Sequence, residues 1–380
     1  MTKHLFFKFV HRAIEWLFRP RTLALVFLKN GVVLLVAVLG LDILAQADFQ
    51  GVSTAWSFRI ASGEGLPKWA MLGAFGLGCM LAILGIIVAA QRAWADIKKE
   101  ARQKLIIVEL RGLHNSPDSP AKGAELGEYI GQKEWVQVDF RPQGKDALVD
   151  PELALAQIGG IETTVEILAA GRDKGDIHLA IGGLAAVPAL FLAGMLVDDE
   201  TNVTLYDWDR SAKIWRLVEG SDDGKRFEPL EGAEVVAGTR EVVLAVSVSY
   251  PIDTQALRQT FGASMPIARL TSNEILADRF WSEEKQQAYA ASLRDAIQKL
   301  MTVGVQRIHM VLAAPASLSI RMGMAYDRRL MPDLIVYQYE KTAAPPYPWG
   351  IQMPTHGHTH AKVVWSDTPR NNSFSARTEE

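Results

Sequence analysis

The sequence contains a single cysteine, Cys79, among its 380 residues. One cysteine excludes a disulfide framework, a thiolate metal cluster and a CxxC redox site within one chain. An excess of basic residues is also lacking, because 40 lysines and arginines stand against 43 aspartates and glutamates. This balance gives no support for binding along a long nucleic acid, which requires a basic surface.

Signatures of several enzyme classes are missing as well. No Walker A sequence or GxGxxG fingerprint occurs, and residues 105–342 contain no HD, DHH or HExxH motif. Only Asp198–Glu200 and Asp207–Asp209 form acidic clusters worth testing, and a solvated loop explains the first of these better. We therefore predict a protein that is not an enzyme, with no cofactor and no metal site.

Long apolar runs are, by contrast, concentrated in the first hundred residues. Residues 69–90 contain no charged side chain, and a helix of that length is about 33 Å long, enough to cross a hydrocarbon core of about 30 Å. Trp69 and Trp94 stand near the two ends of this run, where indole rings prefer the membrane interface. The run predicts a transmembrane helix over residues 69–91.

An earlier apolar run, residues 23–45, carries two charges, Lys29 and Asp42. They are about 20 Å apart along a helix, so each falls near an opposite interface when the helix is centred in the bilayer. We predict a first transmembrane helix here, with Asp42 either functional or reaching the outer headgroups. The alternative is a cleaved signal peptide, because Ala45-Gln46-Ala47 is a small-x-small pattern.

Basic residues are distributed unevenly around the two runs. Five precede the first run and five lie within residues 92–104, whereas the intervening residues 46–68 contain only Arg59 and Lys68. The positive-inside rule therefore predicts an extracytoplasmic loop at 46–68 and both termini in the cytoplasm. Residues 1–22 are interpreted as a basic interfacial segment and residues 92–104 as a basic linker.

Small residues recur at helical spacing in the second run, at Ala74, Gly78, Ala82 and Gly85. Such a face lets helix backbones approach closely in lipid. It either joins the hairpins of different copies or packs the hairpin of one chain, and the sequence leaves both possibilities open.

Residues 105–342 alternate β-rich and amphipathic segments, which predicts an α/β domain. Strands of a mostly parallel sheet are expected at 105–110, 135–140, 176–181, 203–208, 241–248, 307–312 and 334–339, and helices at 151–170, 186–196, 282–302 and 317–330. Residues 343–380 are rich in Pro, Ser and Asn and are predicted to form a disordered tail, in which three spaced histidines favour only adventitious metal binding.

A repeat divides this domain into halves of about residues 105–219 and 231–341. IHLAIGGLAAVPALFLAGM (177–195) matches IHMVLAAPASLSIRMGM (308–324), and VTLYDWD (203–209) parallels LIVYQYE (334–340). His178 and His309, which are equivalent in this repeat, are interpreted as buried core residues rather than catalysts.

These paired patterns resemble the SAVED domain, a sensor of bacterial CBASS antiphage systems that consists of two fused CARF-like, Rossmann-like halves. With two transmembrane helices in front, the whole chain resembles the TM-SAVED effectors. The resemblance implies an inner-membrane, multi-pass protein that binds a cyclic di- or trinucleotide made by a partner CBASS nucleotidyltransferase. It also implies ligand-bridged, head-to-tail self-association that clusters the membrane helices in the lipid bilayer.

Candidate ligand contacts are chosen where open α/β sheets bind ligands, at the carboxyl ends of strands and the N-termini of the following helices. Arginine suits phosphate and aromatic rings suit base stacking. The candidates are Arg111, His114, Asn115, Gly182, Gly183, Leu184, Ser249, Tyr250, Trp281, Pro315, Ala316, Ser317 and Arg321. A surface ion pair for Arg111 and core packing for Tyr250 are equally open, and Trp208 and Trp215 are interpreted as core.

The favoured function is an antiphage effector that binds a cyclic oligonucleotide, oligomerises and disrupts the inner membrane in abortive infection. A membrane-tethered phosphodiesterase or nuclease that degrades such a ligand is one alternative. A ligand sensor that signals to a separate protein is another.

Overall fold

The computed structural model divides the chain into two compact units, Met1–Arg102 and Gln103–Glu380. The residues that the structure describes are 14, 23–46, 67–113, 126, 131–142, 148–197, 202–232, 234, 238–277, 279–355 and 357–366.

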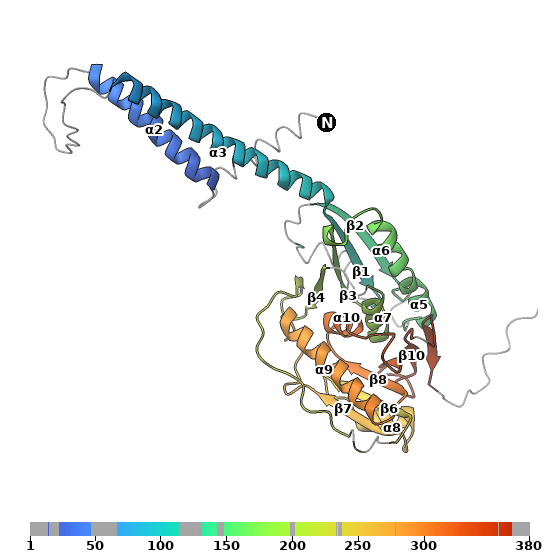
Figure 1. Cartoon of the computed structure of the whole chain (residues 1–380). Coiled ribbons are helices and arrows are strands. Elements are labelled where there is room, and N and C mark those ends of the chain that lie inside the picture. Colours follow the sequence, from blue (N-terminus) through green and yellow to red (C-terminus); the bar gives the residue numbers. More distant parts are fainter. Residues whose placement is uncertain are drawn as a thin grey trace, which may run out of the picture. The chain divides into compact units, whose positions relative to one another are not determined.

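The first unit contains two apolar helices, α2 (Leu23–Gln46) and α3 (Lys68–Arg102), which lie side by side (Figure 1). Within the described ranges, one helical segment, Trp69–Arg102, is long and apolar enough to cross a membrane, and Leu23–Val38 is a shorter apolar segment. Large apolar side chains such as Leu72, Ile83 and Ile86 are exposed on α3. The exposed face therefore suits lipid better than water.

The small residues of α3 face α2 of the same chain. A Cβ added at Gly78 would lie 3.1 Å from the carbonyl oxygen of Gly31, and one at Gly85 would lie 2.9 Å from that of Ala24. A Cβ added at Gly31 would lie 2.6 Å from the backbone nitrogen of Ala82. Gly78, Ala82 and Gly85 of the predicted packing face thus lie against α2 of the same chain, and Ala74 on the same helix is half-buried.

The second unit begins with a five-stranded sheet. Its first four strands are parallel, and the last is antiparallel to its neighbour. The two central strands, β1 and β3, are largely buried, whereas the edge strand β2 has one buried residue. In the order β2-β1-β3-β4-β5, the strands are β1 (Lys104–Arg111), β2 (Gln132–Asp139), β3 (Ile177–Leu184), β4 (Asn202–Asp209) and β5 (Ile214–Leu217).

A six-stranded sheet follows and repeats this order. Strands β7, β6, β8 and β9 are mutually parallel, and two antiparallel strands follow at one edge. In the order β11-β10-β9-β8-β6-β7, they are β6 (Glu241–Ser247), β7 (Ile267–Thr271), β8 (Arg307–Ala313), β9 (Asp333–Gln338), β10 (Trp349–Gln352) and β11 (Lys362–Trp365). Because β2 corresponds to β7, β1 to β6, β3 to β8 and β4 to β9, the two halves share one topology.

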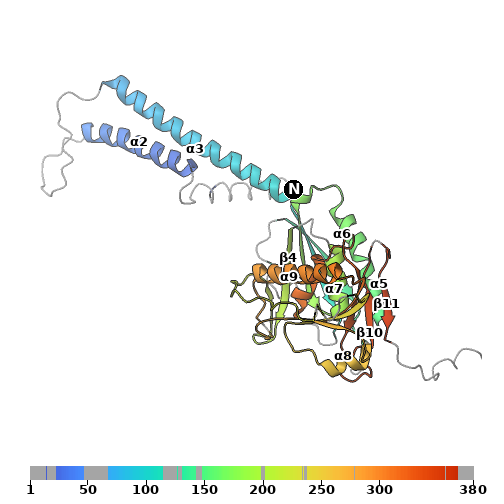
Figure 2. The ribbon, with the colours of Figure 1, turned by 60° about the horizontal axis from the view of Figure 1, so that its bottom comes forward.

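One hydrophobic core joins both sheets through the helices between them (Figures 1 and 2). These helices are α5 (Pro151–Gly159), α6 (Ile161–Ala169), α7 (Val187–Val197), α9 (Glu283–Thr302) and α10 (Ala316–Met324). Helix α8 (Thr254–Phe261) packs in a separate cluster on the other face of the six-stranded sheet, and Lys174–Asp176 form a 3₁₀ turn. Helix α7 is apolar on nearly all sides because it lies inside the core.

Helices α7 and α10 cross at a pair of glycines. A Cβ on Gly194 would collide with the carbonyl oxygen of Ile320, and a Cβ on Gly323 would collide with that of Phe191. The contact is reciprocal. Gly194 comes three residues after Phe191, which contacts Gly323, and Gly323 comes three residues after Ile320, which contacts Gly194. The repeat therefore places equivalent helices face to face at backbone contact.

The structure corrects the sequence-based prediction in three places. The predicted disordered tail contains β10 and β11, because Trp349, Ile351 and Met353 are buried and offset the polar composition around them. The helix expected at 151–170 breaks at Gly160, which caps α5 and starts α6. The helix expected at 317–330 ends at Met324, before the turns that lead to β9.

Candidate functional site

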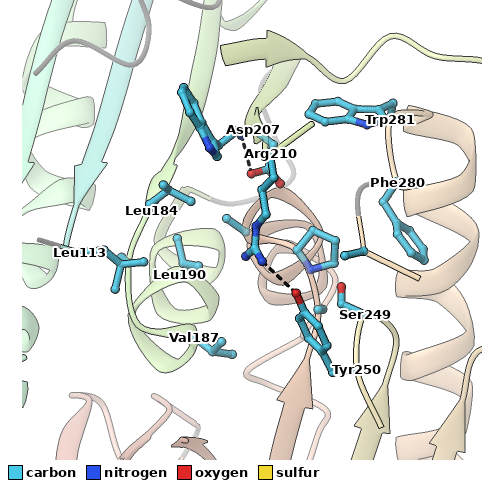
Figure 3. A pocket seen from close by; sticks show the side chains of 16 residues that line it. Leu113, Leu184, Val187, Leu190, Asp207, Arg210, Ser249, Tyr250, Phe280 and Trp281 are labelled. Atoms are coloured by element: carbon cyan, nitrogen blue, oxygen red, sulfur yellow. Dashed lines mark hydrogen bonds between the residues drawn. The ribbon is translucent and has the colours of Figure 1, made fainter. Parts of the chain in front are cut away.

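A cleft opens where the carboxyl ends of strands from both halves meet the N-termini of α7 and α10. Its volume is about 150 Å³. It is lined by Leu113, Leu184, Ala185, Val187, Leu190, Asp207, Trp208, Arg210, Ser249, Tyr250, Ala277, Phe280, Trp281, Ala314, Pro315 and Ala316 (Figure 3). The lining is mostly apolar and aromatic, with two charged side chains, and both halves contribute to it.

The two helix N-termini at the cleft already have acceptors from the opposite half. The backbone N–H of Ser317, in α10, donates to Asp207 Oδ2 at 2.8 Å. The backbone N–H of Val187, in α7, donates to Gln338 Oε1 at 3.0 Å. These donors were expected to hold an anionic ligand; instead, each is occupied by a side chain at the end of the other half's fourth strand.

Asp207 is a buried carboxylate in the cleft wall, with 6% of its surface exposed. Its Oδ1 accepts the backbone N–H of Trp208 at 2.7 Å. Burial raises the pKa of Asp207, and hydrogen bonds from Ser317 and Trp208 counteract part of that effect. Each carboxylate oxygen accepts one backbone N–H, and such hydrogen bonds favour the charged form of the group.

Arg210 and Tyr250 connect the two halves at the cleft. Arg210 follows β4 and is exposed, and its Nη1 donates to the Tyr250 hydroxyl at 2.9 Å (Figure 3). Tyr250 itself is 52% exposed. This hydrogen bond leaves other guanidinium donors of Arg210 available, because an arginine carries five.

Aromatic rings stand around the same opening. Trp281 and Phe280 lie across the cleft from Leu184 and Leu113 (Figure 3). The guanidinium carbon of Arg216 lies 4.8 Å from the ring centroid of Trp281, a cation–π contact that braces the indole. Trp208 is half-buried and packs edge-on against buried Trp215 at 5.4 Å between centroids.

Six of the thirteen predicted ligand contacts line this cleft. They are Leu184, Ser249, Tyr250, Trp281, Pro315 and Ala316. Ser317 lies beside it, fully buried, with its N–H on Asp207 and its hydroxyl accepting Gln286 Nε2 at 2.8 Å. Pro315 and Ala316 are there because a strand-to-helix turn carries them to the sheet edge.

Other predicted contacts are used within the fold. Arg111 forms a buried ion pair with Glu109 at 2.5 Å. Arg321 pairs with Glu283 of α9 at 3.1 Å and does not line the cleft. Gly182 packs against Tyr206 and Gly183 against Leu110, where no Cβ fits, so their missing side chains serve strand packing rather than ligand access. His114 and Asn115 lie outside the described residues.

Asp207, Trp208, Arg210 and Phe280 line the cleft but were not among the predicted contacts. The first three belong to the end of β4 and the residue after it, a strand-end position of the kind used to choose the other candidates. Trp208, which is interpreted from the sequence as core, packs against the core cluster around Trp215 and also lines the cleft. Phe280 had no comparable signal.

No group of three or more His, Cys, Asp or Glu side chains that could hold a metal ion occurs in the described part of the chain.

Comparisons with known proteins identify two domains. The family model for "SMODS-associated and fused to various effectors sensor domain" (SAVED) matches residues 161–353, and that for "SAVED-fused 2TM effector domain" matches residues 3–155. No curated protein matches the chain.

Solved structures of similar fold include Cap4 SAVED/CARF-domain receptors. One from Acinetobacter baumannii, with the cyclic trinucleotide 2'3'3'-cAAA, is 12% identical with a TM-score of 0.46 and covers 76% of this chain. One from Moraxella osloensis is 10% identical with a TM-score of 0.43 and covers 75% of this chain. In both comparisons the matched region spans 60% of the receptor.

Proposed function

Because the chain belongs to the SAVED family and carries a SAVED-fused 2TM effector domain, we propose that it is a membrane effector that binds a cyclic oligonucleotide. The observation that carries the proposal is the cleft at the strand ends, where exposed Arg210 meets partly exposed aromatic rings. A guanidinium binds phosphate, and an aromatic face stacks a base of any sequence. The two kinds of group are what a nucleotide requires.

The size of the cleft supports binding of part of the ligand. Pockets that enclose a drug-sized molecule occupy about 300–1,000 Å³, whereas this cleft has about 150 Å³. One base therefore enters it, and the rest of a cyclic di- or trinucleotide stays on the open face. A second copy of the domain can contact that exposed part, which would make the ligand a bridge between copies.

Bridging would act on the membrane through the hairpin. The small residues of α3 already pack against α2 of the same chain. When domains stack, neighbouring hairpins would therefore contact one another through their exposed apolar faces. Stacking raises their effective concentration in the bilayer. Clusters above a threshold size would then breach the inner membrane and end the infected cell's growth. The ligand must favour the assembled state, since equal binding to both states shifts nothing.

The setting follows from the same proposal. The basic flanks before residue 23 and after residue 91 favour a topology with both termini and the SAVED domain in the cytoplasm. A CBASS nucleotidyltransferase would supply the ligand there.

The test is dye release from liposomes that contain the full chain, with cyclic di- and trinucleotides added one at a time, and binding measured in parallel by calorimetry. We expect at least one cyclic nucleotide to bind the chain and to trigger dye release. The variant Arg210→Gln should weaken binding about ten-fold or more, since hydrogen bonds to charged groups contribute about 1.5–3 kcal/mol. Lys299→Gln, which removes an exposed charge at the end of α9, is the matched control and should bind normally.

Other outcomes separate the alternatives. Binding and assembly without dye release would favour a sensor that signals to a separate protein. Conversion of the ring to linear products would favour a phosphodiesterase. Failure of every ring to bind would overturn the proposal.

A further inference from the structure

The cleft contains a charged group that phosphate recognition does not require. Asp207 places a carboxylate in its wall at the N-terminus of α10. A carboxylate repels phosphate, so the phosphates of a bound nucleotide are kept away from this end of the helix. Arg210, which is exposed at the same cleft, offers the attractive position for them.

This separation of charge orients a nucleotide. With the phosphate near exposed Arg210, the base extends inward along the aromatic rings toward buried Asp207. The group that meets it there is an acceptor, because an ionised carboxylate has about four acceptor positions and no donor. The backbone N–H groups of Trp208 and Ser317 use two of them, one on each oxygen. Each oxygen therefore keeps a lone pair with which it can accept a further donor.

We propose that Asp207 accepts a hydrogen bond from the exocyclic amino group of the base in the cleft, so that the messenger contains at least one adenine, guanine or cytosine. This inference rests on the proposed function. Each of these three bases carries an exocyclic amino group, a donor that a carboxylate can accept in base recognition. Uracil has no amino group, and its one donor, N3–H, lies between two carbonyl oxygens that a carboxylate repels, so a cyclic nucleotide made only of uridine is a poor ligand.

The second half of the domain supplies an internal comparison. Gln338 occupies the equivalent strand end and caps α7 as Asp207 caps α10, but it does not line the cleft. An amide is sufficient for the capping role. The carboxylate at position 207 is therefore the feature that needs a separate explanation, and contact with a base amino group provides one.

The experiment measures binding to the full chain in detergent, using homogeneous and mixed cyclic di- and trinucleotides of adenosine, guanosine, cytidine and uridine. Each ring that binds is compared with an analogue in which hydrogen replaces one amino group: purine for adenine, hypoxanthine for guanine, 2-pyrimidinone for cytosine. For one such position we expect the wild type to prefer the amino ring by about ten-fold or more. Asp207→Asn should bring the ratio of the two affinities close to one. The amide NH₂ of asparagine is itself a donor and cannot accept a hydrogen bond from the amino group of the base.

The matched control is Gln338→Met, which removes the cap of α7 at a position that does not itself line the cleft. It should lower thermal stability but leave the ratio of affinities for the amino and deamino ligands at the wild-type value. If Asp207 had only a structural role, Asp207→Asn would likewise leave this ratio unchanged. If Asp207→Asn does not fold, Asp207→Ser, which keeps a capping acceptor, replaces it.

A wild-type ratio near one at every position, or a ratio that Asp207→Asn leaves unchanged, overturns the inference while leaving cyclic-nucleotide binding intact. Failure of the wild type to bind any ring overturns the proposed function itself, and the two failures are thus distinct.

Discussion

The two halves of the SAVED domain share a backbone plan but differ where they meet the cleft. Leu105 of β1 pairs with His178, and Val243 of β6 pairs with His309, which sets the equivalence of the two strands. By that register Arg111 corresponds to Ser249, and Gly112 to Tyr250. Duplication has preserved the strand order, while the side chains at the strand ends have diverged.

The divergence has a physical consequence for the site. In the first half, Arg111 is used in a buried ion pair with Glu109, and Gly112 packs directly against Phe140 and Ala185. In the second half, the same positions present Ser249 and Tyr250 to the cleft. The first half contributes Asp207 and Arg210 instead. One composite cleft with two unlike walls results, and not two equivalent sites.

The strongest test of the shared plan is the crossing of α7 and α10. Gly194→Ala and Gly323→Ala each insert a Cβ into a backbone carbonyl of the other helix, and we expect each to destabilise the domain by about 3 kcal/mol or more, the upper end for overpacking. Thermal unfolding of the full chain in detergent measures this.

Gly159→Ala is the control, since a Cβ at that helical glycine meets nothing within 4 Å and should be neutral or slightly stabilising. Similar losses from Gly194→Ala and Gly323→Ala would support a symmetric crossing. A loss of stability from only one of the two variants would show that the two halves have diverged in helix packing as well as in the side chains at the cleft.

The difference at Tyr250 predicts the next largest effect. Tyr250→Ala removes a ring that can stack a base and should weaken ligand binding by about 1–3 kcal/mol. Tyr250→Phe keeps the ring and releases Arg210 from its hydrogen bond, so affinity should be retained or increased. Calorimetric binding to the full chain measures both changes.

Tyr339→Ala is the matched control, because Tyr339 is similarly exposed in the second half but lies outside the cleft lining. Equal losses for Tyr250→Ala and Tyr339→Ala would argue against a stacking site at the cleft.

The sequence was most informative where structure is local. The run LIIVEL predicts a buried strand because almost every side chain in it is apolar, and β1 has every residue buried. The repeat predicts equivalent strands because the duplicated segments keep their apolar pattern, and the strand order is consistent with it.

The site could be predicted only in part, because many of its contacts join distant residues. Strand-end reasoning found Ser249 and Tyr250, whose position depends on one strand. It could not foresee that Asp207 would cap a helix 110 residues away, or that Glu283 of α9 would pair with Arg321. Tertiary packing brings these residues together, and nothing in the local sequence indicates which distant residue each of them contacts. The prediction for the tail is wrong for the same reason, since β10 pairs with the distant strand β9 and its Trp349 and Ile351 are buried in the shared core.

The smallest predicted effect concerns the two equivalent histidines. In the second half, His309 Nδ1 lies 3.0 Å from the Tyr337 hydroxyl, and Nε2 lies 3.3 Å from Glu241 Oε2. Burial lowers the pKa of His309, and Glu241 opposes this only partly. In the folded chain the neutral ring is therefore favoured.

Because unfolding would return the His309 pKa to its ordinary value of about 6.5, the unfolded chain binds the proton more readily. The stability that the neutral ring contributes is thus present above pH 6.5 and is lost as the pH falls toward the lowered folded pKa. Thermal unfolding of the wild type and of His309→Gln across this pH range should show that the difference in their stability narrows at low pH. The variant His178→Gln provides the comparison in the first half. A difference that widens at low pH would mean that protonated His309 is stabilised by Glu241 more than it is penalised by burial, reversing the balance of the two effects.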